Sequence, residues 1–287
     1  MRYSRKELAR AAARNYIDLF ISAYASPPKP ILWQQPDMVL YDIGSKCGAF
    51  NGVLRARLTA DSKERRVCDA QTFFKKRRRS WTWSVDPETT PRRLGDYLVR
   101  KGFVPDWEIP CMAIDLGKVK RKPLPEGLRI LRVEDLKSLR TCINTFDIAL
   151  ASPEFPDREP LWDDAYMSFG IGLTKNWFLG LLNDKPVATS FLFLHQGVAG
   201  IYFVVTMQKA RGRGIGTAMT REALLLAKKL RYDFAVIQAS KMGLPVYERM
   251  GFKEYCKIRK YNSPPKWMHK ASRESVGALG ESIGEEM

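Results

Sequence analysis

A glycine-rich turn between an apolar strand and a helix is the feature that most limits how this chain can fold. Residues 201–206 read IYFVVT, and residues 211–216 read RGRGIG. Three glycines at alternate positions remove the side chains where the backbone must curl, so that successive N–H groups can point into one concavity. The N-terminus of the following helix adds partial positive charge, and the two arginines add full charges. The segment therefore predicts a binding site for a phosphate or pyrophosphate.

Two better-known phosphate-binding patterns do not fit this turn. A P-loop would end in Gly-Lys-Ser or Gly-Lys-Thr, and this turn does not. A dinucleotide-binding turn would follow the first strand of a βαβ unit and would need an acidic residue at the end of the next strand, where Ala239 stands. A plain left-handed turn would need neither three glycines nor two arginines.

From residue 128 onward, the hydrophobic pattern predicts an α+β fold with a mixed, mostly antiparallel central sheet flanked by helices. A strand at 128–133 precedes a helix that opens on Glu134 and Asp135, because carboxylates suit the first turn. Strands at 177–182 and 187–194 form a hairpin across residues 183–186. The remaining predicted elements are strand 200–206, helix 214–230, strand 233–239, helix 244–250 and strand 252–261. This order is not that of a doubly wound fold.

The first 125 residues also alternate between strands and helices. Ser4 and Glu7 form a capping box at the start of a helix that ends before Ser26-Pro27-Pro28. The further predicted elements are strands 38–43 and 50–58, helix 69–79, strand 80–85, helix 90–101 and strand 111–116. Residues 118–125 are basic and contain two prolines, so they are predicted to be a linker.

Two motifs of the second half resemble those of a known family. Residues 211–216 resemble the Arg/Gln-x-x-Gly-x-Gly/Ala signature of the GNAT superfamily of N-acetyltransferases. The run from Tyr247 to Gly251-Phe252 resembles the Tyr-x-x-x-Gly-Phe ending of the same family. The resemblance covers residues 128–262 and implies the GNAT fold. It also implies an acetyl-CoA-dependent N-acyltransferase that acts on a primary amine of a small molecule, amino acid or peptide.

The first half resembles a diverged copy of the same fold. Residues 83–103 contain a strand, a helix and the pair Gly102-Phe103, but Pro91-Arg92-Arg93 stands where a glycine-rich turn would be expected. The resemblance therefore implies two tandem copies, of which only the second binds acetyl-CoA. The predicted domains are residues 1–125, residues 126–262 and a flexible tail at 263–287 that is rich in Gly, Ser and Glu.

The resemblance also assigns roles to individual residues. The pantetheine arm of acetyl-CoA would pair with the backbone of strand 202–205, and strand 234–239 would splay away to open a slot for the thioester. A backbone N–H near Val204 or Val205 would hold the oxyanion, and the Tyr247 hydroxyl would protonate the leaving thiolate. The residues expected to bind the cofactor are Phe203, Val204, Val205, Arg211, Gly212, Arg213, Gly214, Ile215, Gly216, Thr217 and Ser240.

The general base has several candidates, because strand 201–206 carries no carboxylate. Five carboxylates belong to a Pro-rich loop that overhangs the acceptor site in the family: Glu154, Asp157, Glu159, Asp163 and Asp164. A solvated acidic loop and a base that acts through water are the alternatives. His195 stands beside Gln196-Gly197 and is interpreted as an exposed turn residue.

The net charge of +17 keeps a second function open. Residues 1–125 carry 25 basic and 13 acidic side chains, with basic clusters at 75–79 and 118–122. Such clusters suit RNA or ribosome binding, so the alternative is a non-catalytic GNAT-like module that binds nucleic acid or a protein partner. A solvated surface explains the same clusters, and the enzyme is the favoured hypothesis.

Cysteine spacing and hydropathy bear on whether the chain binds a metal, crosses a membrane or is secreted. The five cysteines form no CxxC pair and only two histidines accompany them, so neither a zinc site nor another metal is expected. No apolar run approaches the roughly 20 residues that span a bilayer. The N-terminus also lacks the pattern of a signal peptide. We therefore expect a cytoplasmic protein with free thiols and no membrane partner.

Overall fold

The structure, a computed structural model, describes residues 2–24, 31–44, 48–150, 167 and 169–264. Backbone contacts divide these residues into two units. Unit 1 contains residues 2–23, 109–150, 167 and 169–257, and unit 2 contains the described residues of 24–108 together with 258–264. The predicted acidic loop at 151–160 and nearly all of the predicted tail lie outside the described residues.

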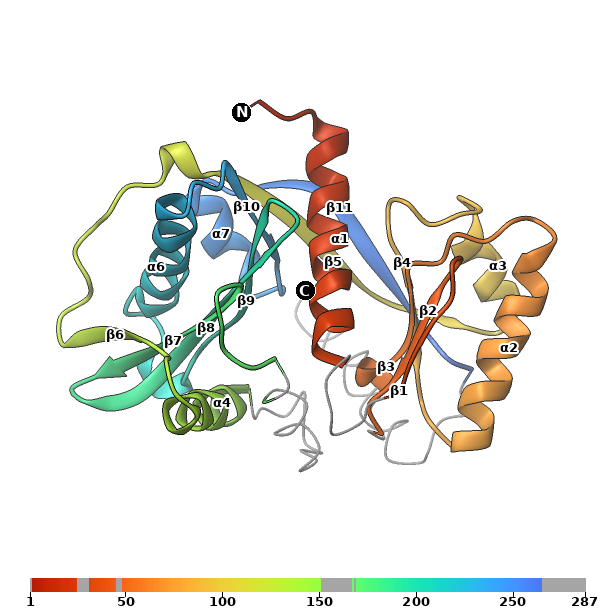
Figure 1. Ribbon diagram of the computed structural model, residues 1–287, viewed down its shortest axis with the longest axis horizontal. Coiled ribbons are helices and arrows are strands. Elements are labelled where there is room, and N and C mark those ends of the chain that lie inside the picture. The colour runs from red at the N-terminus through yellow and green to blue at the C-terminus, as the bar shows by residue number, and fades with distance from the viewer. Residues whose placement is uncertain (1, 25–30, 45–47, 151–166, 168, 265–287) are drawn as a thin grey trace, which may run out of the picture. The chain divides into compact units, whose positions relative to one another are not determined.

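Unit 1 is built on a mixed sheet in the order β5-β10-β9-β8-β7-β6 (Figure 1). All its pairs are antiparallel except β9 with β10, which are parallel and are joined by helix α6. Its strands are β5 (Val104–Asp115), β6 (Leu128–Arg132), β7 (Lys175–Leu182), β8 (Lys185–His195), β9 (Val198–Thr206) and β10 (Phe234–Gln238). Its helices are α1 (Arg5–Tyr24), α4 (Leu136–Leu150), α6 (Ile215–Lys229) and α7 (Leu244–Met250). The predicted mixed, mostly antiparallel α+β fold is confirmed.

Local signals in the sequence explain where several of these elements begin. The Ser4 N–H donates to the Glu7 carboxylate at 2.7 Å and the Glu7 N–H donates to Ser4 Oγ at 3.3 Å, which is the predicted capping box of α1. Asp135 caps α4 by accepting from the Ser138 N–H at 2.8 Å. The β7–β8 turn is shorter than predicted, because only residues 183 and 184 form it, with φ of 48° and 63°.

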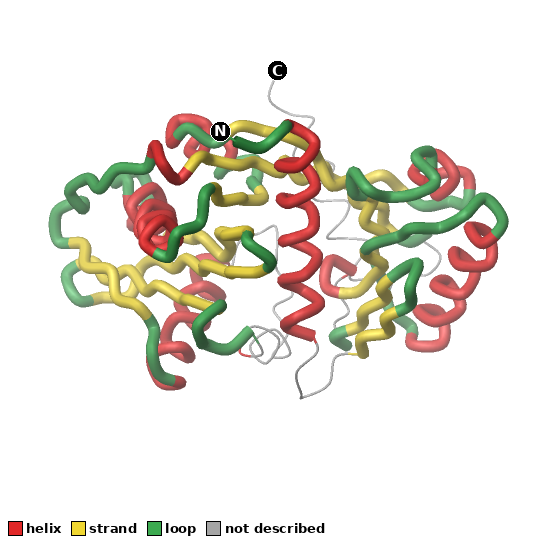
Figure 2. The backbone as a smooth tube through the Cα atoms, turned by 45° about the horizontal axis from the view of Figure 1, so that its top comes forward, coloured by secondary structure: helices red, strands yellow, loops and turns green. Residues whose placement is uncertain are grey.

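Helices cover both faces of the unit 1 sheet (Figure 2). Side chains of α6 and α7 form one core cluster with Leu192, Ile201 and Ile237. Gly200 and Tyr202 lie on either side of Ile201 along β9. The Tyr202 side chain and the open position at Gly200 are therefore on the face of the sheet opposite to this core cluster. Helix α1 packs on that face, where the Tyr202 hydroxyl donates to Asn15 Oδ1 at 2.7 Å.

Unit 2 repeats the same order of elements. Its sheet runs β1-β2-β3-β4-β11, with β3 and β4 parallel and the other described pairs antiparallel. Helix α2 crosses from β3 to β4 as α6 crosses from β9 to β10, and α3 follows β4 as α7 follows β10. The elements are β1 (Ile31–Gln34), β2 (Val39–Asp42), β3 (Asn51–Leu54), α2 (Ser62–Arg77), β4 (Thr82–Val85), α3 (Leu94–Arg100) and β11 (Lys253–Asn262). The predicted tandem arrangement agrees with this order.

The two repeated helices also end in the same way. The Phe103 N–H donates to the Leu98 carbonyl at 3.0 Å, and the Phe252 N–H donates to the Tyr247 carbonyl at 3.0 Å. The glycine before each phenylalanine is left-handed, with φ of 86° at residue 102 and 99° at residue 251. Leu98 therefore stands in unit 2 where Tyr247 stands in unit 1.

The contact units do not follow the predicted boundary at residue 125. β5, from the first half of the chain, pairs with β10 in unit 1 through residues 111–115. β11, the last strand, pairs with β4 in unit 2 through residues 259–262. Helix α1 also belongs to unit 1. A linear division cannot show this exchange, because hydrophobic patterns identify a strand without identifying its partner.

Several predicted elements start at other residues, and β1 was not predicted. Helix α2 begins at Ser62 and not at residue 69, because Thr59 and Ser62 bond each other's N–H groups at 3.0 and 3.1 Å ahead of the first turn. Helix α3 begins at Leu94 and not at residue 90, after a turn in which the Leu94 N–H donates to the Pro91 carbonyl. β5 begins at residue 104 and not at residue 111.

A comparison of two glycines tests the packing of α1 on β9. A Cβ on Gly200 would lie 1.9 Å from Asn15 Oδ1 and 2.4 Å from Tyr202 Cε2, whereas a Cβ on Gly172 would meet no heavy atom within 4 Å. Gly200→Ala should lower the free energy of unfolding by about 2 kcal/mol or more, because the helix must shift. Gly172→Ala should change it little. Urea unfolding measures both, and equal midpoints for the two variants would contradict this packing.

Candidate acetyl-CoA site

The parallel pair β9 and β10 separates part-way along its length. Pairing covers three positions, from Ala199 with Ala235 to Ile201 with Ile237, and β9 then continues to Thr206 without a parallel partner. This opening agrees with the splay of the two strands that the resemblance implied, and a slot for the thioester stays a prediction. The unpaired edge of β9 presents backbone donors and acceptors with which an extended chain can pair.

A bulge in β9 lies beside the opening. The pairing with β8 shifts between Thr189 with Val205 and Phe191 with Tyr202, and Phe203 has a φ of 49°. A positive φ is strained for a bulky residue and costs on the order of 1–3 kcal/mol. Thr189 Oγ1 donates to the Phe203 carbonyl at 2.7 Å and helps to hold this conformation. The bulge re-aims the backbone at Val204 and Val205, where the oxyanion donor was predicted.

An aromatic cluster holds the Phe203 ring. Its ring stacks on Trp177 with centroids 5.3 Å apart and planes at 10°. The rings of Phe146, Phe169 and Phe191 lie within 5.0 to 5.7 Å of it. Such contacts contribute roughly 0.5–1.5 kcal/mol for each pair beyond burial, which is enough to offset the strain at Phe203. The predicted role of Phe203 in cofactor binding is therefore restricted to its backbone.

The glycine-rich turn leaves a row of N–H groups without partners. Gly212 and Gly214 have φ of 78° and 73°, so both use the left-handed conformation that glycine allows. The first hydrogen bond of α6 runs from the Ala218 N–H to the Gly214 carbonyl, and no side chain caps the helix. Within the described part of the chain, the N–H groups of residues 212–217 make no hydrogen bond. Such a row at a helix N-terminus suits an anion.

The side chains of this turn differ in what they contact. The Arg211 guanidinium bonds the Thr206 and Ala149 carbonyls at 3.0 and 3.5 Å, so it fixes the turn to the end of β9. Among the described residues, Arg213 has no ion-pair partner and the Thr217 hydroxyl has no hydrogen-bond partner. Ile215 is buried in the core cluster and offers only its backbone. A Cβ on Gly216 would meet only Thr206 Oγ1, at an ordinary 3.5 Å, so the expectation that Gly216 needs to be glycine is wrong in this structure.

Two further predicted site residues lie on the other side of the opening, after β10. The Gly243 N–H donates to Ser240 Oγ at 3.1 Å, so this hydroxyl shapes the start of α7. Tyr247 is 7% exposed and its ring lies 5.8 Å from that of Phe252, as a core residue would. Burial raises the pKa of Tyr247 to about 12, which keeps the hydroxyl protonated. Its hydroxyl bonds no other described residue.

The predicted general bases are not placed by the structure. Glu154, Asp157, Glu159, Asp163 and Asp164 all lie outside the described residues. His195 is at the β8–β9 turn with its side chain 39% exposed, and its Nε2 lies 3.7 Å from Asp18 Oδ2. The prediction of a turn position is confirmed, but the contact with Asp18 of α1 was not foreseen, because it joins residues 177 positions apart.

Sequence reasoning also missed a buried carboxylate on α4. Asp147 is 3% exposed and follows Phe146, which contacts the bulge residue. The signal was present in the spacing, since residues 139, 143 and 147 recur every four positions on the buried face of one helix.

Comparison with known proteins agrees with this geometry. Residues 144–252 match the model of the acetyltransferase (GNAT) family. This segment belongs to the GNAT family. A search of curated protein sequences found no match. The matched segment contains the bulge, the opening, the glycine-rich turn and Tyr247, and it ends at Phe252.

Solved structures with the GNAT fold extend over both units. A GCN5-related N-acetyltransferase from Kribbella flavida is 16% identical with a TM-score of 0.66, over 88% of this chain and 95% of that one. A second one, from Sphaerobacter thermophilus, is 16% identical with a TM-score of 0.60, over 91% and 93%. A tandem GNAT protein from the clavulanic acid biosynthesis pathway is 11% identical with a TM-score of 0.54, over 88% and 94%. These likenesses show the fold across both halves of the chain.

The Cys142 thiol of α4 is fully buried. Burial raises the pKa of the Cys142 thiol to about 12, so this cysteine is a packing residue and not a nucleophile. In the part of the chain that the structure describes, no group of three or more His, Cys, Asp or Glu side chains could hold a metal ion. No helix among those residues is long and apolar enough to cross a membrane.

Two glycines with the same strained conformation test the anion site. Gly214 and Gly197 have φ of 73° and 75°, and a Cβ on either would meet nothing closer than 3.9 Å. Gly214→Val and Gly197→Val should therefore lose similar stability, on the order of 1–3 kcal/mol. Only Gly214→Val should weaken acetyl-CoA binding, by tenfold or more, because it deforms the row of N–H groups. Calorimetric titration measures this, and equal affinities for the two variants would refute the assignment.

Proposed function

We propose that this GNAT protein is an acetyl-CoA-dependent N-acyltransferase that transfers an acetyl group to a primary amine by direct attack. One observation carries the proposal. The uncapped N–H groups of residues 212–217 follow the end of β9, and the free edge of β9 lines the opening. The turn suits the pyrophosphate of acetyl-CoA, and the edge of β9 suits its pantetheine arm. On this proposal the thioester lies in the opening.

The chemistry follows from the groups at this opening. The ammonium group of the acceptor loses one proton to a carboxylate or a water molecule, and the nitrogen of the neutral amine then attacks the thioester carbon. The carbonyl π electrons move to oxygen, and a backbone N–H at Val204 or Val205, exposed by the bulge, stabilises the oxyanion. The nitrogen of the tetrahedral intermediate then loses its second proton to the same base or to water, and the carbonyl re-forms as the C–S bond breaks. The Tyr247 hydroxyl protonates the departing sulfur and later regains a proton from solvent. The products are the amide and CoA.

The protonation state of Tyr247 is compatible with the role of acid, although burial makes it a weaker proton donor than an ordinary phenol. Its neighbour Gly243 allows the ring to approach, because a Cβ there would lie 2.8 Å from Tyr247 Cε2. A phenol with a pKa of about 12 is fully protonated at neutral pH and can donate without first gaining a proton. Leu98, at the matching place in unit 2, has no hydroxyl to offer.

The structure also bears on the alternative of a nucleic-acid-binding module. Arg77 and Arg79 of the basic cluster lie 3.6 and 3.7 Å from the carboxylate of Asp42, which is 4% exposed. The Arg77 guanidinium also lies over the Phe73 ring at 3.9 Å. Two of the five cations are thus engaged within unit 2, which leaves less charge for phosphate contacts and favours the enzyme.

Tyr247→Phe tests the acid, because it keeps the ring and removes only the hydroxyl. Turnover should fall by about ten- to a thousandfold, with nearly unchanged affinity for acetyl-CoA and thermal stability. In the wild type, the raised pKa of Tyr247 keeps the hydroxyl protonated, so no loss of its contribution is expected between pH 8 and 10. Wild-type turnover in the variant, with chemistry rate-limiting, would show that water protonates the thiolate.

A titration tests which unit binds the cofactor. In unit 2 the connection that matches the glycine-rich turn is residues 55–61, between β3 and α2, and not Pro91-Arg92-Arg93, which lies between β4 and α3. Residues 55–61 contain no glycine, and Arg57 is paired there with Asp86 at 3.2 Å. Calorimetry should therefore find one acetyl-CoA per chain. Two equivalent sites would contradict the assignment of binding to unit 1 alone.

A further inference from the structure

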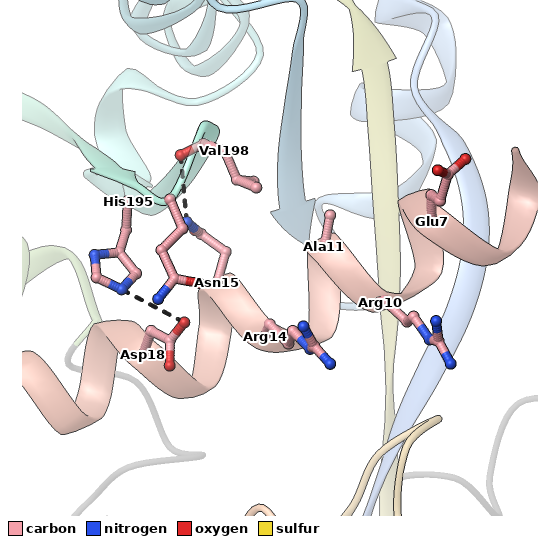
Figure 3. A pocket seen from close by; sticks show the side chains of 9 residues that line it. Glu7, Arg10, Ala11, Arg14, Asn15, Asp18, His195 and Val198 are labelled. Atoms are coloured by element: carbon pink, nitrogen blue, oxygen red, sulfur yellow. Dashed lines mark hydrogen bonds and ion pairs between the residues drawn. The ribbon is translucent and has the colours of Figure 1, made fainter. Parts of the chain in front are cut away.

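A cavity of about 300 Å³ lies between α1 and the β8–β9 turn of unit 1 (Figure 3). Seven of the nine residues that line it have charged or polar side chains, whereas the core on the other face of the sheet is apolar. The residues that line it are Glu7, Arg10, Ala11, Arg14, Asn15, Asp18, His195, Gln196 and Val198.

The charges along α1 in this cavity are ordered. Arg10, Arg14 and Asp18 follow one another at four-residue spacing, so they lie in a row on one face of the helix. Figure 3 shows the two guanidinium groups side by side, and Asp18 beside His195. A helix rises about 1.5 Å per residue, so Arg14 and Asp18 are separated by roughly 6 Å along the axis. Each of these three residues also contacts other groups of the protein, so a ligand would join existing interactions.

Asn15 connects this cavity to the strand that borders the opening. Asn15 lines the cavity, donates to the Val198 carbonyl at 3.4 Å and accepts from the Tyr202 hydroxyl at 2.7 Å. Tyr202 directly follows Ile201, the last residue of β9 that pairs with β10. Burial raises the pKa of the Tyr202 phenol, and Asp18 adds to that shift. The cavity is therefore joined through Asn15 and Tyr202 to the strand that borders the opening.

We propose that this cavity binds the acceptor, and that the acceptor is a small amino acid whose ammonium and carboxylate groups are several bonds apart. The proposal rests on the acyltransferase function proposed above. Asp18 would hold the ammonium group, and Arg14 with Arg10 would hold the carboxylate. The spacing of the row favours an ω-amino acid with a chain of about four to six carbons over glycine.

Matched pairs of amines test this substrate class. The probes are glycine, 4-aminobutanoate and 6-aminohexanoate, each with the amine that lacks the carboxylate: methylamine, propylamine and pentylamine. With acetyl-CoA, kcat/KM should be about tenfold or more higher for 6-aminohexanoate than for pentylamine, since a charge-assisted contact is lost in the amine. The advantage should be smaller for glycine over methylamine. Calorimetry without acetyl-CoA should show the same order of affinities.

Variants on α1 assign the effect to the cavity. With 6-aminohexanoate as the acceptor, Arg14→Gln should raise KM by about tenfold and leave kcat unchanged, and with pentylamine it should leave KM unchanged as well. Arg14→Lys should restore part of the loss. Lys6→Gln removes the same charge from an exposed position on the same helix outside the cavity, and it should change KM for neither acceptor. Arg14 is exposed, so its replacement does not threaten folding.

The outcomes separate this inference from the proposed function. Turnover of all the amines without any preference for a carboxylate, or an equal effect of Arg14→Gln and Lys6→Gln, would overturn the cavity as the acceptor site while the acyltransferase stands. Failure to bind acetyl-CoA would instead overturn the acyltransferase. A carboxylate preference that Arg14→Gln abolishes and Lys6→Gln preserves supports both.

Discussion

The conformation of Phe203 is the constraint on which the rest of the site depends. A right-handed crossover such as β9–α6–β10 places two parallel strands next to each other, and nothing in that connection forces them apart. The bulge turns β9 after three paired positions, and it persists because the Phe203 ring is held among Trp177, Phe146, Phe169 and Phe191. The contacts of the aromatic cluster thus stabilise the bulge, which leaves the edge of β9 open and changes the direction of its backbone.

Helix α1 supports the other side of the same strand. The absence of a side chain at Gly200 lets Asn15 reach the Tyr202 hydroxyl. The helix is further tied to this unit by Tyr3, whose hydroxyl donates to Asp233 at 2.7 Å, and by Gln238, whose amide donates to the Ala12 carbonyl at 2.9 Å. The first helix of the chain is therefore part of the unit that contains the glycine-rich turn, and it places ordered charges beside the β8–β9 turn.

The two units share one topology, but they differ in the groups that are proposed to bind acetyl-CoA. Both units have the strand, crossover helix, parallel strand and short helix in the same order, and both short helices end on a left-handed glycine. Unit 1 has glycines and uncapped N–H groups after its first parallel strand. Unit 2 has residues 55–61 there, which contain no glycine, and Leu98 in place of a tyrosine. The fold is shared, but the groups that would bind an anion and donate a proton are present in one unit.

The sequence by itself determined the features that depend on neighbours in the chain. The capping box at Ser4, the left-handed glycines of the turn at 211–216, the hairpin turn at Asn183 and most element types follow from local sterics and hydrogen bonding, which a short segment carries within itself. Tertiary structure decided the partners of β5 and β11 and the bulge at Phe203. It also decided the contact of His195 with Asp18 and the hydrogen bonds from Arg211 to backbone carbonyls. These features join residues that are distant in sequence, and a periodic pattern shows which face of a segment is buried but not what it is buried against.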